Sequence, residues 1–131
     1  MKTNESPFGA VIYAYTRKQA IADGMQIDVT KTAQEAGIEF PVFLTRGVFA
    51  TYVAVPEGVT GQDEAGRLWD VIWMARFAIL RSHGHTDRLP VALYVRNDNR
   101  AAKLIKLIAV CSALDMDDPQ PAITIMLPTE D

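Results

Sequence analysis

Residues 62–82 read QDEAGRLWDVIWMARFAILRS, and this stretch decides the fold of the chain. It contains no proline, its only glycine falls in the first turn, and Gln62 or Asp63 can cap its start, so it predicts one helix of about five turns. At about 100° per residue, one face of this helix collects apolar side chains. They are Leu68, Val71, Ile72, Ala75, Ala78 and Ile79, and the arc continues around the side through Trp69, Trp73 and Leu80. An apolar arc this wide predicts a helix enclosed by the rest of the domain.

Charged residues interrupt the apolar pattern of this helix. Arg67, Asp70 and Arg81 mark its predicted polar edge, whereas Arg76 projects into the apolar arc. One interpretation, which we favour, is that the alkyl stem of Arg76 packs on the core while its head reaches water or stacks on an indole. The other is that its guanidinium lines a cleft and binds an anion.

The composition predicts a single ordered, soluble domain over residues 1–131. The chain is long enough for one core and too short for two comfortable domains, and its 49% hydrophobic and 22% charged residues are globular values. A net charge of −3 argues against direct nucleic-acid binding. Because no apolar run is long enough for a membrane span and the first ten residues lack the apolar segment of a signal peptide, we expect a cytoplasmic protein.

Cys111 is the only cysteine, and it lies in an apolar run. We therefore expect a small buried hydrophobe. A single cysteine excludes a disulfide within the chain, which agrees with a reducing cytoplasm.

The N-terminal half predicts short helices that end at glycines. After a loose lead-in over residues 1–9, the β-branched and aromatic residues 10–15 predict a strand. A helix over 17–23 follows, capped by Thr16 and stopped by Gly24. Residues 25–29 form either a brief strand or an extended connection.

Two further short helices are expected. Residues 31–36 predict a helix capped by Thr30 and stopped by Gly37. Residues 41–44 then link to a helix over 46–55, with Thr45 as its cap and Pro56 closing it. Its inner face would carry Phe49, Tyr52 and Val53.

From residue 91 onward the hydrophobic period becomes that of strands. Residues 91–96 predict a strand ending at a turn of Asn97, Asp98 and Asn99, residues 103–111 a second strand, and residues 122–127 a third. The loop DMDDPQP joins the last two, giving an antiparallel meander. Lysines spaced three apart leave a helix open for 103–111, but the crowding of Ile, Val and Cys favours a strand.

These elements predict an α+β fold. A small, mostly antiparallel sheet, to which residues 10–15 can add a strand, packs against the one long central helix, and short helices precede it.

No constellation predicts catalysis, a metal or a cofactor. His83, His85 and Asp87 lack a further ligand at a characteristic spacing, so a solvated turn is the favoured interpretation. The chain has no glycine-rich phosphate loop, no nucleophile elbow and no pair of cysteines two residues apart. Cys111 has no neighbouring base to activate its thiol.

Two polar clusters are candidates for binding a partner or ligand. Tyr13, Tyr15, Thr16 and Arg17, where a strand meets a helix N-terminus, could grip a phosphate or carboxylate, although capping and core packing explain them too. Residues 96–100 form a polar hairpin tip whose arginines could contact an acidic partner. The candidate binding residues are Tyr13, Tyr15, Arg17, Arg76, Arg96 and Arg100.

Five stretches of the chain carry a resemblance to a known family: VIYAYTRKQAIADGMQIDVT, PVFLT, PEGVTGQDEAGRLWDVIWM, VRNDNR and PAITIMLPTED. Together they span nearly the whole sequence. On these residues the chain resembles a small family of unknown function encoded by bacterial plasmids, phages and integrated mobile elements. The resemblance implies an accessory gene of mobile DNA, a setting in which small proteins often inhibit CRISPR or restriction, and it implies no catalytic residue.

Three hypotheses about function follow. The first is a non-catalytic protein that binds a host or element-encoded protein, as an inhibitor of host defence does, through a few aromatic or arginine anchors. The second is a nucleotide-binding enzyme of ADP-ribosyltransferase-like type, because residues 12–24 faintly resemble the opening of such domains. Asp118 and Glu130 are candidates for its later acidic residue. The third is a structural subunit that forms a homodimer through a sheet edge.

Overall fold

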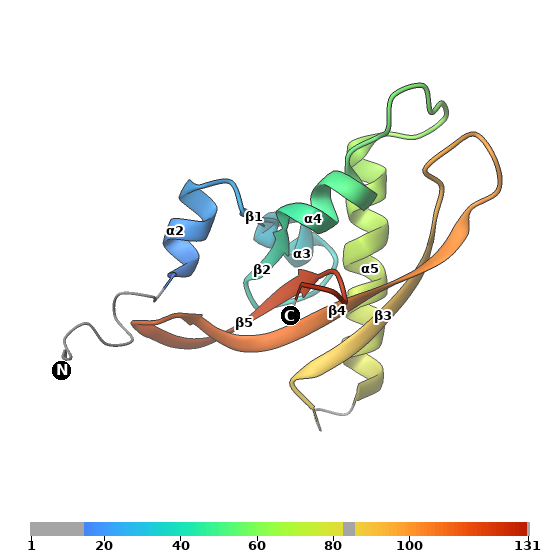
Figure 1. Ribbon diagram of the computed structural model, residues 1–131. Helices are drawn as coiled ribbons and strands as arrows, with labels where there is room; N and C mark the ends of the chain where they lie inside the picture. The colour runs from blue at the N-terminus through green and yellow to red at the C-terminus, as the bar shows by residue number, and fades with distance from the viewer. Residues whose placement is uncertain (1–14, 83–85, 131) are drawn as a thin grey trace.

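The computed structural model describes residues 15–82 and 86–130, which form an α+β fold with one long helix beside a five-stranded sheet (Figure 1). The elements follow one another as α2 (Arg17–Ala22), β1 (Gln26–Asp28), α3 (Thr30–Glu35), β2 (Val42–Thr45), α4 (Arg46–Val48), the π-helical turn η1 (Phe49–Val53), α5 (Glu64–Ser82), β3 (Arg88–Val95), β4 (Lys103–Asp115) and β5 (Asp118–Met126). The α+β class, the long helix and the short helices before it agree with the prediction.

The sheet has the order β1-β2-β5-β4-β3. Three of its four neighbouring pairs run antiparallel, including the predicted meander of β3, β4 and β5. The exception is β2, which pairs parallel to β5 with Val42 opposite Ile123 and Leu44 opposite Ile125. The sheet is therefore mixed, and its two halves come from opposite ends of the chain.

Residues 41–44, expected to be a link, instead contain the strand β2. Val42 and Leu44 are fully buried in this strand, which lies between β1 and β5. The prediction was wrong because a buried strand of four residues shows no alternation, so its period does not distinguish it from a connection. Of the two alternatives left open for residues 25–29, the structure shows the brief strand, β1.

The choice of a strand over a helix for residues 103–111 is confirmed by β4. Both β4 and β5 are longer than predicted, and only Met116 and Asp117 separate them, so most of the expected loop DMDDPQP is strand. The predicted strand over 10–15 lies outside the described residues except for Tyr15, which precedes α2 and is not in a strand. The lead-in over 1–9 also lies outside them.

The short helices begin close to where they were predicted. Thr16 caps α2 in a capping box with Gln19, and Gly24 follows the helix in a left-handed conformation. In α3, however, Thr30 is the first helical residue, and its hydroxyl accepts a hydrogen bond from the backbone N–H of Val42. Thr30 therefore anchors α3 to β2 instead of capping the helix.

The helix expected over 46–55 is divided into α4 and the π-helical turn η1. Thr45 caps it as predicted, by accepting from the backbone N–H of Val48 at 3.2 Å. Val53 is fully buried, while Phe49 and Tyr52 are half-buried against the core, which confirms the predicted inner face.

The core lies between the inner face of α5 and the sheet. Val71, Ile72 and Ala75 of α5 are fully buried in one cluster with Val91 of β3 and Leu107 of β4. Alternation along β3 and β4 directs every second side chain toward α5, as the sequence pattern predicted.

Cys111 is exposed, which contradicts the expectation of a buried hydrophobe. It shares the strand parity of the buried Leu107 and Ala109, but β4 extends beyond the part of the sheet that α5 covers (Figure 1). The apolar run therefore predicted the strand correctly, but fewer of its residues are buried than the run suggested.

Candidate protein-binding surface

The outer face of α5, opposite its core face, carries a row of large apolar side chains. Trp69, Trp73, Phe77 and Leu80 are spaced by four, four and three residues, so at about 100° per residue they share one side of the helix. Their exposed fractions are 37%, 44%, 48% and 59%. We call this row the α5 stripe.

The rings of the stripe are held in place by their neighbours. Trp69 and Trp73 stack with centroids 5.8 Å apart and planes 16° apart. The guanidinium of Arg76 lies 5.0 Å from the Trp73 ring, and that of Arg81 lies 5.2 Å from the Phe77 ring. The favoured interpretation of Arg76 left its head group either to reach water or to stack on an indole, and the structure shows it over the Trp73 indole. These contacts order the stripe while leaving its surface open.

Charged groups flank the stripe on both sides. The helical angle places Arg76 on one flank, and Asp70 and Arg81 on the other. Within residues 15–82 and 86–130, none of the three has an ion-pair partner. A molecule that covers the stripe would therefore meet unpaired charges of both signs at its rim.

The expectation that α5 would be enclosed is wrong for its outer face. The helix is apolar on two opposite sides, and the described part of the chain forms a single sheet, which covers only one of them. An exposed apolar row is unusual on a surface that stays in contact with water, and such rows mark sites that contact a protein, a membrane or a ligand. The signal for this surface in the sequence is a second row of apolar residues on the side of the helix opposite its core face. Trp69, Trp73 and Leu80 were placed in the predicted apolar arc, but Phe77 was not.

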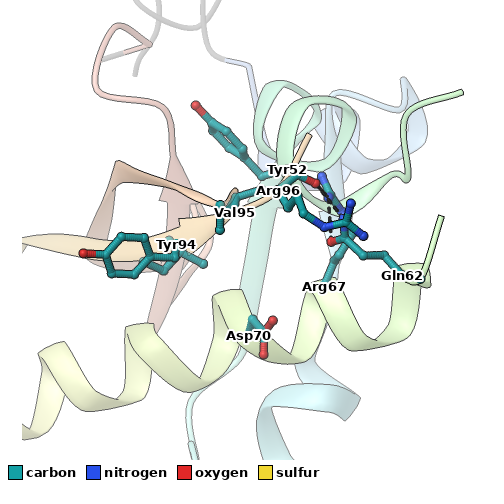
Figure 2. Close-up of a pocket in the computed structure, with 10 residues that line it drawn as sticks. Tyr52, Gln62, Arg67, Asp70, Tyr94, Val95 and Arg96 are labelled. Atoms are coloured by element: carbon teal, nitrogen blue, oxygen red, sulfur yellow. Dashed lines mark hydrogen bonds between the residues drawn. The ribbon is translucent and has the colours of Figure 1, made fainter. Parts of the chain in front are cut away.

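Arg67 was expected on a polar edge but is 5% exposed. Its Nε donates to the carbonyl of Val53 at 3.1 Å, and Nη2 donates to Oδ1 of Asn97 at 2.6 Å. Nη1 donates to the carbonyl of Arg96 at 2.8 Å and to Oε1 of Gln62 (Figure 2). Burial, together with the nearby charge of Arg96, lowers the pKa of Arg67. Its guanidinium ties η1, α5 and the end of β3 together.

A hollow of about 260 Å³ opens beside this network (Figure 2). Tyr52, Arg67, Asp70, Tyr94 and Arg96 are among the residues that line it. Both arginines direct their donors to carbonyl and amide oxygens of the chain itself, so the geometry supports a structural role for this cluster rather than the capture of a ligand.

Arg96 and Arg100, two of the predicted binding residues, lie at the tip of the β3–β4 hairpin. Arg96 donates to the backbone carbonyls of Asp98 and Thr60 and to Oδ1 of Asn99, which fixes the tip to the loop before α5. Arg100 is exposed and is hydrogen-bonded through its backbone N–H to Asp98. The hairpin tip is thus braced, and the Arg100 side chain remains open to a partner.

Arg17 is occupied by contacts within the chain. It lies 4.2 Å above the Phe43 ring, and its guanidinium donates to Leu114, Gln26 and Thr124 at 2.6 to 2.9 Å. The pKa of Arg17 is lowered, because the effect of burial outweighs the opposing effects of the negative charges of Asp115 and Asp28. The structure therefore shows Arg17 joining α2 to the sheet.

The start of α2, proposed as an anion grip, already holds a carboxylate. Asp115 accepts from the backbone N–H groups of Arg17 and Lys18, each at 3.1 Å. Tyr15 is exposed and donates to Asp23, and these contacts with Asp23 are the main cause of its raised pKa. Tyr13 lies outside the described residues.

The acidic residues considered for an enzyme are occupied by hydrogen bonds within the chain. The side chain of Asp118 accepts from the backbone N–H of Gln120, and that of Glu130 accepts from the Thr45 hydroxyl and the Leu127 N–H. His83 and His85 lie outside the described residues. Within the described ranges, no group of three His, Cys, Asp or Glu side chains could hold a metal ion.

No protein-family model, curated protein or solved structure matches this chain. The helices of the described residues include none that is long and apolar enough to cross a bilayer. Function is therefore inferred from the side chains and their contacts.

Proposed function

We propose that this protein acts by binding another protein through the α5 stripe, without chemistry of its own. The observation that carries the proposal is the exposure of Trp69, Trp73, Phe77 and Leu80 along one side of a helix whose opposite side is core. A helix that is apolar on both sides is normally covered on both. The second covering layer is what a partner would supply.

The composition of the stripe supports this function. Tryptophan, other aromatic residues and arginine are enriched at protein interfaces, and a few such residues usually provide most of the binding free energy. Here Trp73 and Arg76 form one stacked pair and Phe77 and Arg81 another. Because these contacts already restrict the side chains, less conformational entropy is lost when a partner binds.

The test is capture of a partner by matched variants. The purified chain is immobilised, exposed to a bacterial lysate, and compared with the double variant Trp73→Ser, Phe77→Ser. The control is Tyr94→Ser, Leu104→Ser, a pair of exposed apolar residues that face each other on β3 and β4. We expect the first variant to lose a protein that the wild type and the control both retain.

Equal capture by the two double variants would contradict the role of the stripe. Loss of the partner only in the Tyr94 and Leu104 variant would place the binding surface on the sheet instead. Repeating the comparison with Arg100→Ala tests whether the hairpin tip contributes.

We further propose, from the resemblance to proteins of plasmids, phages and integrated elements, that the partner belongs to a cytoplasmic host defence system of the CRISPR or restriction type. Phage plating on host strains with each defence, with and without the protein, tests this role. We expect plating efficiency to rise with the wild type and not with Trp73→Ser, Phe77→Ser. An unchanged efficiency against every defence tested would contradict the role in defence but not protein binding itself.

A further inference from the structure

We infer that a second copy of this chain is an occupant of the α5 stripe, with the two α5 helices antiparallel and the two-fold axis next to Trp73. This inference rests on the proposed function, because it names a partner for the same surface. A foreign partner would have to displace the second copy in order to bind.

The order of side chains along the stripe suits this pairing. Trp73 lies near the middle of α5 and of the stripe. With the axis beside it, Trp73 meets Trp73 of the second copy, and Trp69 comes level with Phe77 of the second copy. A two-fold interface requires such a self-complementary surface, and at the positions of Trp69, Trp73 and Phe77 ring meets ring.

The charges at the rim are also self-complementary. A two-fold axis perpendicular to the helices brings like flanks together, and Asp70 and Arg81 share one flank of α5 by helical angle. Arg81 of one copy then lies on the same side of the interface as Asp70 of the other. Side chains on a helix tilt toward its N-terminus, so in antiparallel helices Arg81 and Asp70 of the other copy lean toward each other.

On the other flank, Arg76 comes beside Trp69 of the second copy. Asp70, Arg76 and Arg81 have no ion-pair partner within the described ranges, so no existing ion pair among these residues has to break. Antiparallel helices also align opposite ends of their dipoles. A parallel pairing would instead align the two helix dipoles in the same direction and would not bring Arg81 beside Asp70 of the other copy.

The sheet edges offer a poorer surface for self-association. The edge strand β3 contains Pro90, which lacks a backbone N–H, and the other edge strand, β1, has only three residues. Short strands and proline are devices that prevent pairing between sheet edges. The α5 stripe is therefore the surface on which a homodimer would form.

Sedimentation velocity over a range of concentrations tests the inference through a charge exchange. We expect the wild type to form a dimer. Arg81→Glu and Asp70→Arg should each raise the dissociation constant of the dimer by about tenfold or more, because each substitution places like charges opposite each other at both symmetry-related positions. An equimolar mixture of the two variants should recover the dimer. In the mixed pair, the introduced glutamate of one copy faces the introduced arginine of the other, and the unaltered Asp70 faces the unaltered Arg81. Lys106→Glu, an equal change of charge at an exposed position of β4, is the control and should leave the dimer unchanged.

All the substituted positions, the control included, are exposed, and circular dichroism checks that each variant remains folded. A wild type that stays monomeric at high concentration would overturn the inference. So would a dimer that both single variants leave intact, or a mixture that fails to recover association. A monomer that still captures a foreign protein through Trp73 and Phe77 would overturn the homodimer alone and leave the proposed function standing.

Discussion

Arg67 is the residue on which the region around α5 most depends. Its buried guanidinium satisfies two backbone carbonyls and two side-chain amides, drawn from η1, the loop before α5 and the end of β3. The sequence could not show this, because Arg67 was placed on a polar edge of the helix and three of its four acceptors, in Val53, Arg96 and Asn97, are distant in the chain. The indole contact of Arg76 was predictable, since that contact is local to α5.

Replacing Arg67 by lysine should destabilise the fold by about 2–4 kcal/mol, because the planar fork is lost and buried acceptors are left unpaired. Chemical denaturation, which gives the free energy of unfolding, measures the effect. Arg81→Lys, at an exposed position of the same helix, is the control and should change the stability by about 0.5 kcal/mol or less. Equal stability of the two variants would contradict the role assigned to Arg67.

Asp115 should make stability depend on pH under acidic conditions. Hydrogen bonds from the backbone N–H groups of Met116, Lys18 and Arg17, of which that from Met116 is the strongest influence, lower the pKa of Asp115. A carboxylate with a lowered pKa stabilises the fold above its unfolded pKa of about 3.9, and this contribution is lost as the pH falls through the folded value.

We therefore expect Asp115→Asn to be less stable than the wild type near neutral pH, with the difference shrinking as the pH falls below about 4. Urea denaturation at a series of pH values tests this. A difference that stays constant down to the lowest pH would show that the ionised carboxylate is not what stabilises α2.

At the level of elements, α5 has two functions on its two sides. The inner side provides Val71, Ile72 and Ala75 to the core, while the outer side presents the α5 stripe. The helix and its inner face were predictable because their apolar period is strong and local. The sequence could not predict whether the outer side is covered, because that depends on how many layers the rest of the chain forms.

The two sides should respond differently to substitution. Ile72→Ala should cost about 2–4 kcal/mol through the cavity it leaves, whereas Leu80→Gln should cost about 0.5 kcal/mol or less because Leu80 is exposed. Thermal and chemical unfolding of the two variants, at concentrations below the dimer range, gives the comparison. A large loss of stability in Leu80→Gln would mean that the outer side also packs against the domain.

For the whole molecule, the sequence predicted the α+β class and the antiparallel meander but not the parallel pairing of β2 with β5. The meander is predictable because its strands are neighbours in the sequence and are joined by short turns. The parallel pair joins residues about eighty positions apart, and the local hydrophobic pattern contains no information about such a pairing. The resulting sheet covers one side of α5 and leaves the stripe exposed on the other.

The central claim is that the α5 stripe becomes covered by protein, and intrinsic fluorescence tests it most directly, because Trp69 and Trp73 are the only tryptophans in the chain. We expect that, as the protein concentration rises, the emission maximum shifts to shorter wavelength and quenching by acrylamide falls, while Arg81→Glu shows neither change over the same range. Adding a captured partner should produce the same shift. Emission that stays at long wavelength and fully quenchable at every concentration, and also with that partner present, would contradict the claim.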